Sequence, residues 1–92
     1  MEAVAKISEV FGTSTEDLIQ KSLISFIEKE TRLAEEDIAN LRDRYDCVSK
    51  EGLYKAIESK KIVSHPAWED YIVWKNKENH IQKMTKELKN LI

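Results

Sequence analysis

The stretch that decides the fold is residues 15–45, TEDLIQKSLISFIEKETRLAEEDIANLRDRY, which contains neither glycine nor proline. Within it, mostly apolar side chains recur at alternating intervals of three and four positions, the spacing that places them along one side of an α-helix. The positions of this seam are Ile24, Ile27, Thr31, Ala34, Ile38, Leu41 and Tyr45. The stretch therefore predicts one long amphipathic helix whose seam needs a second helix to cover it.

A second seam of the same kind occupies residues 66–91. Pro66 suits the first turn of a helix, because its φ angle is already helical and it has no N–H to satisfy. A connection of about twenty residues can return this helix antiparallel to the first. We therefore predict an all-α fold built on a long antiparallel hairpin of residues 15–45 and 66–91. The expected second seam is Ala67, Tyr71, Trp74, Glu78, Ile81, Thr85, Leu88 and Ile92.

Two short helices are expected to accompany the hairpin. Residues 2–11 form the first, and Gly12 follows at a position where a left-handed helix end is common. Residues 50–60 form the second, a connecting helix with Leu53, Tyr54 and Ile57 turned inward. The N-terminal helix is expected to fold back over three apolar side chains that widen the first seam, namely Leu23, Phe26 and Leu33.

The composition favours a single helical domain over residues 1–92. The chain is 41% hydrophobic and 35% charged, with only two glycines and one proline, which leaves few places for the turns of a sheet. A lone cysteine, Cys47, cannot form an internal disulfide, as is usual in a reducing compartment. The N-terminal segment does not resemble a signal peptide, and no apolar run is long enough to span a membrane. We expect a cytoplasmic protein with no membrane partner.

Charge is divided unevenly along the chain. The net charge is −2, but residues 1–46 carry −5 and residues 47–92 carry +3. A dedicated nucleic-acid-binding protein usually has a basic surface, so a nucleic-acid partner is not expected. The simplest interpretation is that the two halves of the chain lie against each other, so that their opposite charges partly compensate. The alternative interpretation is that the basic half binds an acidic partner.

Side chains with the spacing of a catalytic or metal site are scarce. His65 and His80 are fifteen positions apart, roughly 22 Å along one helix, so they cannot share a metal ion within one chain. There is no GxSxG motif and no glycine-rich phosphate loop. We therefore expect a protein that is not an enzyme and that has neither a cofactor nor a metal.

Two alternative functions remain open. Lys75 precedes His80 by five positions, a weak likeness to small helical RNases, in which the pair would act across a dimer. Residues 7–19 have some features of a helix-turn-helix around Gly12, which would indicate a DNA-binding regulator. The acids Glu16 and Asp17 lie where DNA contacts would be needed, which disfavours the second alternative.

The aromatic residues of 65–81, HPAWEDYIVWKNKENHI, are the better indication of function. Trp68 and Trp74 are about 240° apart around a helix, so they cannot share one narrow seam. A small chain has little of itself with which to cover a helix that is apolar on several sides, and tryptophan and tyrosine are common anchors of protein interfaces. The predicted protein interface consists of Trp68, Tyr71, Ile72 and Trp74, with Phe26 and Leu33 as counterparts on the first long helix.

Residues 16–76 also resemble a group of known proteins. The long acidic helix ending in RDRYD, the short helix after it and the motif HPAWEDYIVW are similar to small helical proteins of archaea and cyanobacteria encoded beside nuclease-like toxins. Such proteins resemble antitoxins of two-gene toxin–antitoxin modules. The resemblance implies a non-enzymatic protein that binds and neutralises a cognate toxin, as a homodimer or in a complex with a small protein partner.

Overall fold

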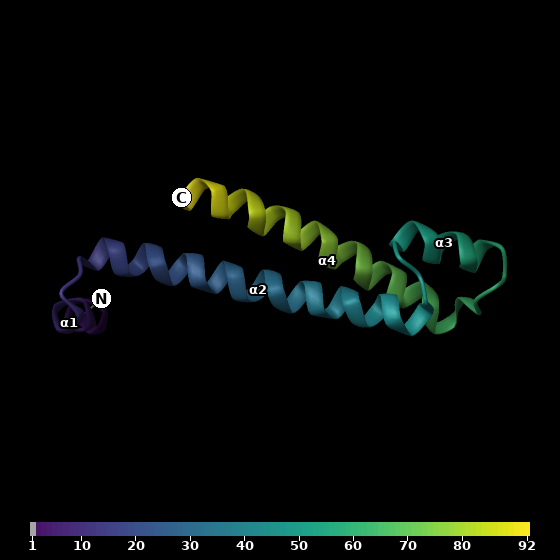
Figure 1. Cartoon of the computed structure of the whole chain (residues 1–92), viewed down its shortest axis with the longest axis horizontal. Helices are drawn as coiled ribbons and strands as arrows, with labels where there is room; N and C mark the ends of the chain where they lie inside the picture. The colour runs from purple at the N-terminus through teal and green to yellow at the C-terminus, as the bar shows by residue number, and fades with distance from the viewer. Residues whose placement is uncertain (1) are drawn as a thin grey trace.

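A computed structural model describes residues 2–92, and within this range the chain forms four α-helices and no strand. The helices are α1 (Glu2–Phe11), α2 (Thr15–Tyr45), α3 (Lys50–Glu58) and α4 (Ser64–Leu91). Figure 1 shows α2 and α4 as the two arms of a long hairpin, in a molecule of 60 × 20 × 18 Å. The predicted all-α hairpin is confirmed.

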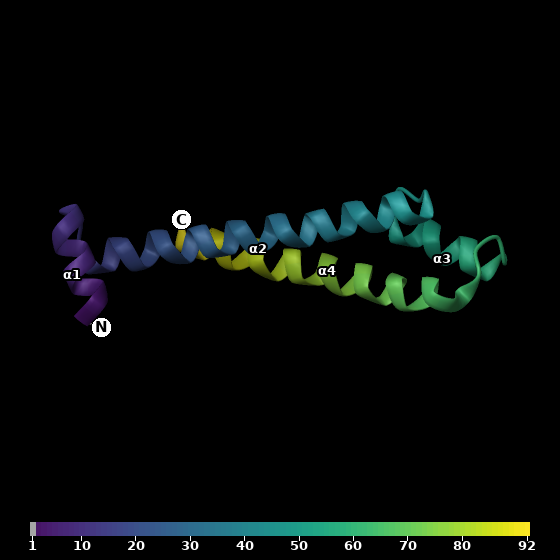
Figure 2. The same cartoon turned by 90° about the horizontal axis from the view of Figure 1, so that it is seen from below.

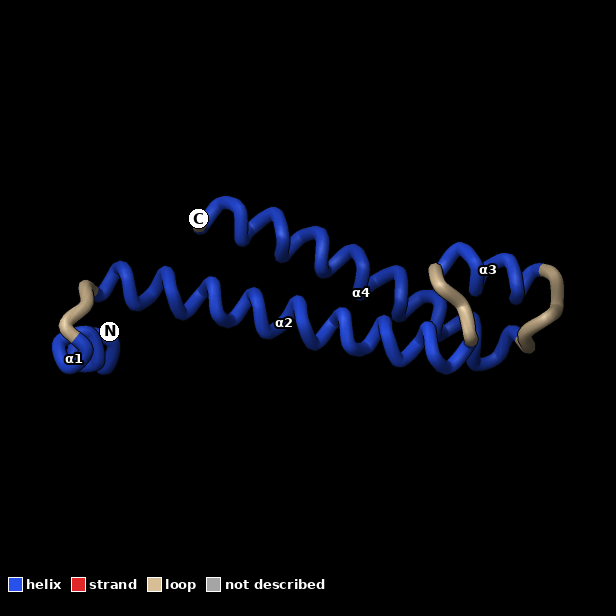
Figure 3. Tube along the Cα trace, viewed as in Figure 1, coloured by secondary structure: helices blue, strands red, loops and turns tan. Residues whose placement is uncertain are grey.

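The two short helices lie at opposite ends of the hairpin. In Figures 1 and 2, α3 packs at the closed end, where the chain passes from α2 to α4, and α1 crosses the beginning of α2 at the open end. Figure 3 shows that only short loops join the four helices. None of the helices within residues 2–92 combines the length and apolar character needed to cross a membrane.

Local signals in the sequence set the limits of α2. Gly12 adopts a φ of 66°, the left-handed conformation that ends α1 at low cost only when the residue has no Cβ. The hydroxyl of Ser14 then accepts a hydrogen bond from the Asp17 N–H, so this pair supplies the N-terminal cap. At the other end Asp46, at a φ of 52°, terminates the helix.

The core is thin and lies mainly toward the closed end. Its buried cluster joins α2, α3 and α4, and consists of Ile38, Leu41, Leu53, Ala67 and Trp74. Ala34 and Met84 are also buried. The predicted α2 seam is confirmed, since each of its seven positions is buried or half-buried.

The seam of α4 departs from the prediction in its last third. Met84 is buried where Thr85 was expected, and Leu91 is half-buried whereas Ile92 is 82% exposed. A straight α-helix has 3.6 residues per turn, so its inward face drifts by about 20° per heptad relative to a repeat of 3.5. That drift would move the inward position forward, toward Thr85 and Ile92, and it is not observed. Ala67, Trp74, Ile81 and Leu88 are instead buried or half-buried at strict intervals of seven residues, the repeat of a coiled coil, and only the intermediate positions lie one residue earlier, at Met84 and Leu91.

One helix boundary differs from the prediction, and the start of α4 agrees with it once its first residues are considered. The connecting helix ends at Glu58 rather than at residue 60, because Lys60 takes a left-handed φ of 61° and its N–H bonds back to the Ile57 carbonyl. Helix α4 begins formally at Ser64, but His65 has non-helical angles, so regular helix starts at Pro66 as expected.

Helix α1 does not cover the stripe that it was expected to cover. The groove between α1 and α2 is lined on the α2 side by residues between Leu18 and Leu23, and Phe26 and Leu33 are left 60% and 41% exposed. Because α1 crosses α2 instead of running along it (Figure 2), ten residues cannot extend over both side chains.

Replacing Trp74 by alanine should lower the free energy of unfolding by about 3–5 kcal/mol, the usual cost of removing a large aromatic side chain from a packed core. Trp74 has no exposed surface and belongs to the only continuous cluster of buried side chains within residues 2–92. Urea denaturation followed by circular dichroism measures the change. Val63→Ala, at an exposed position, is the control and should change stability by less than about 0.5 kcal/mol. A similar small change for Trp74→Ala would contradict the described core.

Candidate functional site

Three aromatic side chains from two helices pack together at the closed end of the hairpin. Tyr54 of α3 lies 6.1 Å from Trp68 and 5.4 Å from Tyr71, measured between ring centroids. Trp68 and Tyr71 of α4 are stacked, with centroids 5.4 Å apart and planes 22° apart. These separations fall in the range of favourable aromatic pairs. We call Tyr54, Trp68 and Tyr71 the aromatic cluster.

The aromatic cluster is ordered by its own contacts, yet it faces outward. Trp68 is 45% exposed and Tyr54 38%, while Tyr71 is half-buried beneath them. Ile72, four positions after Trp68 on α4, extends the apolar surface. The result is a rigid aromatic surface that the described chain leaves partly uncovered.

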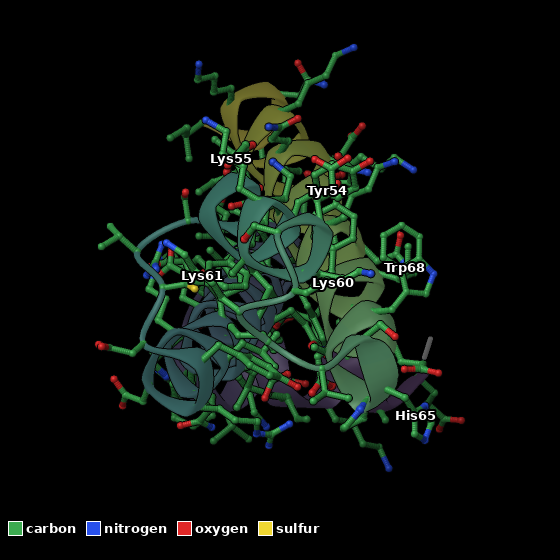
Figure 4. All side chains as sticks on the ribbon, turned by 90° about the vertical axis from the view of Figure 1, so that its right-hand side faces the viewer. Tyr54, Lys55, Lys60, Lys61, His65 and Trp68 are labelled. Carbon is green, nitrogen blue, oxygen red and sulfur yellow. The ribbon has the colours of Figure 1, made fainter. Side chains whose placement is uncertain are left out.

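The charges beside the aromatic cluster are of both signs. The end-on view in Figure 4 places Tyr54, Lys60 and Trp68 on one side of α3, with Lys55 and Lys61 on the other. His65 Nδ1 lies 3.0 Å from Glu69 Oε1, one turn along α4. The cluster therefore has a mixed rim rather than a basic one.

An acid at the start of α4 connects this end of the molecule to α2. Asp70 Oδ2 accepts hydrogen bonds from the Arg44 guanidinium, at 3.0 Å, and from the Tyr45 hydroxyl. Burial, followed by the hydrogen bond to Asp70, raises the pKa of Tyr45. The hydrogen bond to Asp70 likewise raises the pKa of Arg44. These contacts hold the first turns of α4 in a defined position, and with them Trp68 and Tyr71.

Trp74 of α4 lies in the core beneath this end of the molecule. It is completely buried, its indole N–H donates to Glu78 Oε1 at 3.2 Å, and the Arg42 guanidinium carbon lies 5.8 Å from its ring centroid. Lys50 Nζ lies 2.8 Å from Glu78 Oε2, which joins α3 to α4. Hydrogen bonds to Glu51 and then Glu78 raise the pKa of Lys50. Inclusion of Trp74 in the predicted interface was therefore wrong, because no part of its side chain is available to a partner.

Phe26 and Leu33 are exposed, but they do not adjoin the aromatic cluster. Thr31 lies opposite Met84, with 4.0 Å between Oγ1 and Sδ, and Met84 follows Trp68 by sixteen residues. At 1.5 Å per residue this corresponds to about 24 Å along α4. The two predicted groups of interface residues therefore form separate surfaces.

The structure also shows where the residues of the RNase and DNA-binding alternatives lie. Lys75 and His80 are both exposed on α4, and five positions turn them about 140° apart around the helix. They do not converge within one chain. Glu16 and Asp17 occupy the first turn of α2, inside the segment proposed as a helix-turn-helix. Among residues 2–92, no three His, Cys, Asp or Glu side chains gather in a way that could hold a metal ion.

Tyr54 is the site residue that sequence reasoning missed. The pattern of residues 50–60 placed it with Leu53 and Ile57 on the inner face of the connecting helix. The structure buries Leu53 completely and leaves Tyr54 at the edge, against Trp68. In a helix of nine residues, the spacing of Leu53, Tyr54 and Ile57 places them on one broad face but does not show which of them points into the core.

The fold and the site together define a small helical-hairpin protein with an exposed aromatic cluster at its closed end. The sequence profile described as the Uncharacterized protein MJ0235 family matches residues 1–92, and the chain belongs to that family. Comparison with curated proteins and with solved structures gave no match. The family description names no activity.

Replacing Tyr45 by phenylalanine should reduce the loss of stability at alkaline pH. The folded chain raises the pKa of Tyr45 above its ordinary 10.0, so the folded state keeps the phenolic proton to a higher pH than the unfolded state does. The resulting stabilisation is complete below about pH 10 and is lost as pH rises through the raised pKa. The wild-type free energy of unfolding should therefore fall more steeply above this pH than that of Tyr45→Phe.

Urea denaturation at a series of pH values measures the two slopes. The pKa of Lys50 is also raised, but Lys50 is present in both proteins and cancels in the comparison. Equal slopes would contradict the hydrogen-bonded, partly buried state of Tyr45.

Proposed function

We propose that this chain is a non-enzymatic protein-binding protein that docks a protein partner on its aromatic cluster and Ile72. The observation that carries the proposal is that Trp68 stays 45% exposed although it is stacked against Tyr71 and packed on Tyr54. Burying the rest of this side chain needs surface that residues 2–92 do not provide at this end.

The geometry of the cluster supports protein binding in particular. Tryptophan and tyrosine are the residues that most often dominate interface energetics. Here their rings are already held by each other and by the Asp70 contacts, so binding would cost less side-chain entropy than for a mobile aromatic residue. The surface is thus prepared for a partner that presents an apolar group.

The rim of the cluster favours a protein over a nucleic acid. Single-stranded nucleic acids stack on aromatic side chains that line a positively charged groove. Lys60 lies on the same side of α3 as Trp68 in Figure 4, and the His65–Glu69 pair flanks Trp68 along α4. A partner with both acidic and basic groups around an apolar centre fits this rim.

The finer proposal is that the partner is a cognate toxin and that binding neutralises it. Its support is the resemblance of residues 16–76 to antitoxins encoded beside nuclease-like toxins, and the aromatic cluster lies within that segment. The protein encoded by the adjacent gene is the partner to test first.

Replacing Trp68 by alanine should weaken binding to the purified product of the neighbouring gene by about thirtyfold or more, the effect of losing an interface anchor worth at least about 2 kcal/mol. Calorimetric titration measures the affinity. Val73→Ala is the matched control, because Val73 lies on the same helix, is 42% exposed, and faces the polar cleft of Asp37 and Lys77 instead. Val73→Ala should change the affinity less than about threefold.

Chemical denaturation of each variant separates binding from folding. Trp68→Ala is expected to keep its cooperative unfolding transition, because nearly half of this side chain is already exposed. Unchanged affinity in Trp68→Ala would overturn the assignment of the cluster. Failure of the neighbouring protein to bind the wild type would overturn the antitoxin-like proposal.

The RNase alternative has its own experiment. Lys75 and His80 would have to act with groups of a second copy, since they lie on different sides of α4. Incubating RNA with wild type and with His80→Ala should show no cleavage that depends on His80. Loss of a measured activity in His80→Ala would instead establish the enzyme. For the DNA-binding alternative, binding that weakens steeply with salt would be the supporting result.

A further inference from the structure

We propose that the open end of the hairpin binds the open end of a second copy of this chain. The open end consists of α1, residues 15–26 of α2 and residues 83–91 of α4. This proposal goes beyond the proposed function, because it concerns a different surface and a different partner.

An apolar groove lies between α1 and α2 at this end. Its volume is about 390 Å³. It is lined by Val4, Ile7, Leu18, Ile19, Ser22 and Leu23. We call it the α1–α2 groove. Ser8 of α1 is buried, and its hydroxyl donates to the Val4 carbonyl, so this polar group of α1 is satisfied within the helix.

Helix α4 does not reach over the groove. The Gln20 side-chain amide donates to the Leu91 carbonyl, which places the last turn of α4 beside Gln20. Figure 2 shows α1 and the first turns of α2 continuing past that point. The groove and the apolar side chains around it therefore have no cover within residues 2–92.

The apolar area at this end matches what one side of a stable dimer requires. Exposure is 80% for Val10, 74% for Phe11 and 60% for Phe26, and nearly half for Ile7 and Leu23. At roughly 150–200 Å² per large apolar side chain, these five expose on the order of 500 Å². A standard interface uses about 800 Å² on each partner, of which about 60% is apolar, or roughly 480 Å².

The charges at the open end are self-complementary. Residues 2–23 carry four acids and two lysines, whereas residues 83–91 carry three lysines and one acid. A two-fold interface brings the same patch of both copies together. It can therefore place Glu9 and Glu16 of one copy near Lys86 and Lys89 of the other, twice. A partner with a single sign of charge, such as an anionic lipid surface, would be repelled by the acids of α1 and α2.

Such a dimer would leave both aromatic clusters free. The cluster lies at the closed end of a 60 Å molecule, far from the proposed two-fold axis. One assembly could then hold two partner proteins at its opposite ends.

Sedimentation equilibrium of the full chain over a range of concentrations tests the proposal. The wild type should approach twice the chain mass of 10.7 kDa. Leu23→Glu and Phe26→Glu, which place a charge beside the groove, should each raise the dimer dissociation constant by about a hundredfold, as expected for loss of an interface anchor. Val48→Glu is the matched control, because Val48 is 87% exposed and lies at the closed end; it should leave the dissociation constant unchanged.

Charge reversal gives an independent measurement at exposed positions that should not disturb folding. The pair Lys86→Glu with Lys89→Glu should weaken the dimer, and so should Glu9→Lys with Glu16→Lys. Combining all four should restore it. A wild type that stays monomeric, a dimer indifferent to Leu23→Glu and Phe26→Glu, or co-sedimentation with anionic lipid vesicles would each overturn the proposal.

Trp68→Ala distinguishes this proposal from the preceding one. It should leave the dimer dissociation constant unchanged, since Trp68 lies at the closed end. The opposite result is a dimer that dissociates in Trp68→Ala and stays intact in Phe26→Glu. That result would place self-association on the aromatic cluster and would overturn the open-end interface.

Discussion

The burial of Trp74, a residue of α4, against side chains of α2 and α3 is the interaction on which the rest of this structure depends. Complete burial of a tryptophan removes about 150–250 Å² from water, which is worth roughly 4–6 kcal/mol at 25 cal/mol per Å². The guanidinium of the Arg44–Asp70 ion pair is more than half exposed, so solvent screens this attraction strongly. Hydrophobic burial therefore stabilises the hairpin more than this ion pair does, and the indole N–H is satisfied by Glu78, which Lys50 in turn joins to α3. One side chain thus fixes the relative positions of three helices.

As a result, buried side chains are distributed unevenly along the hairpin. The core cluster lies toward the closed end, where α2, α3 and α4 meet, whereas the open end holds the buried Met84 and several half-buried aliphatic side chains. The opposite charges of the two halves are partly paired within the chain, as between Lys77 and Asp37 at 3.0 Å. Apolar surface remains at both ends, as the aromatic cluster and as the α1–α2 groove, and both proposals follow from this distribution.

Much of the architecture was predictable because it depends on local signals. The seam of α2, the glycine after α1, the serine cap of α2 and the start of regular α4 at Pro66 are properties of neighbouring residues. The site was less predictable. Trp68, Tyr71 and Ile72 keep some exposed surface, which their predicted role as an interface requires, whereas Trp74 belongs to the core. Tyr54 was missed because its contact with Trp68 joins residues fourteen positions apart.

By itself, the sequence determined that this chain forms two long amphipathic helices with short ones at either end, because periodicity and capping act within a few turns. Only the tertiary structure decided which apolar side chains are covered. Trp74 is enclosed in the buried cluster that joins α2, α3 and α4, whereas Trp68 packs only against the edge formed by Tyr54 and Tyr71 and stays 45% exposed. Phe26 is exposed because α1 crosses α2 instead of running along it. Crossing angles and helix ends depend on the packing of the whole chain, and no local pattern encodes them.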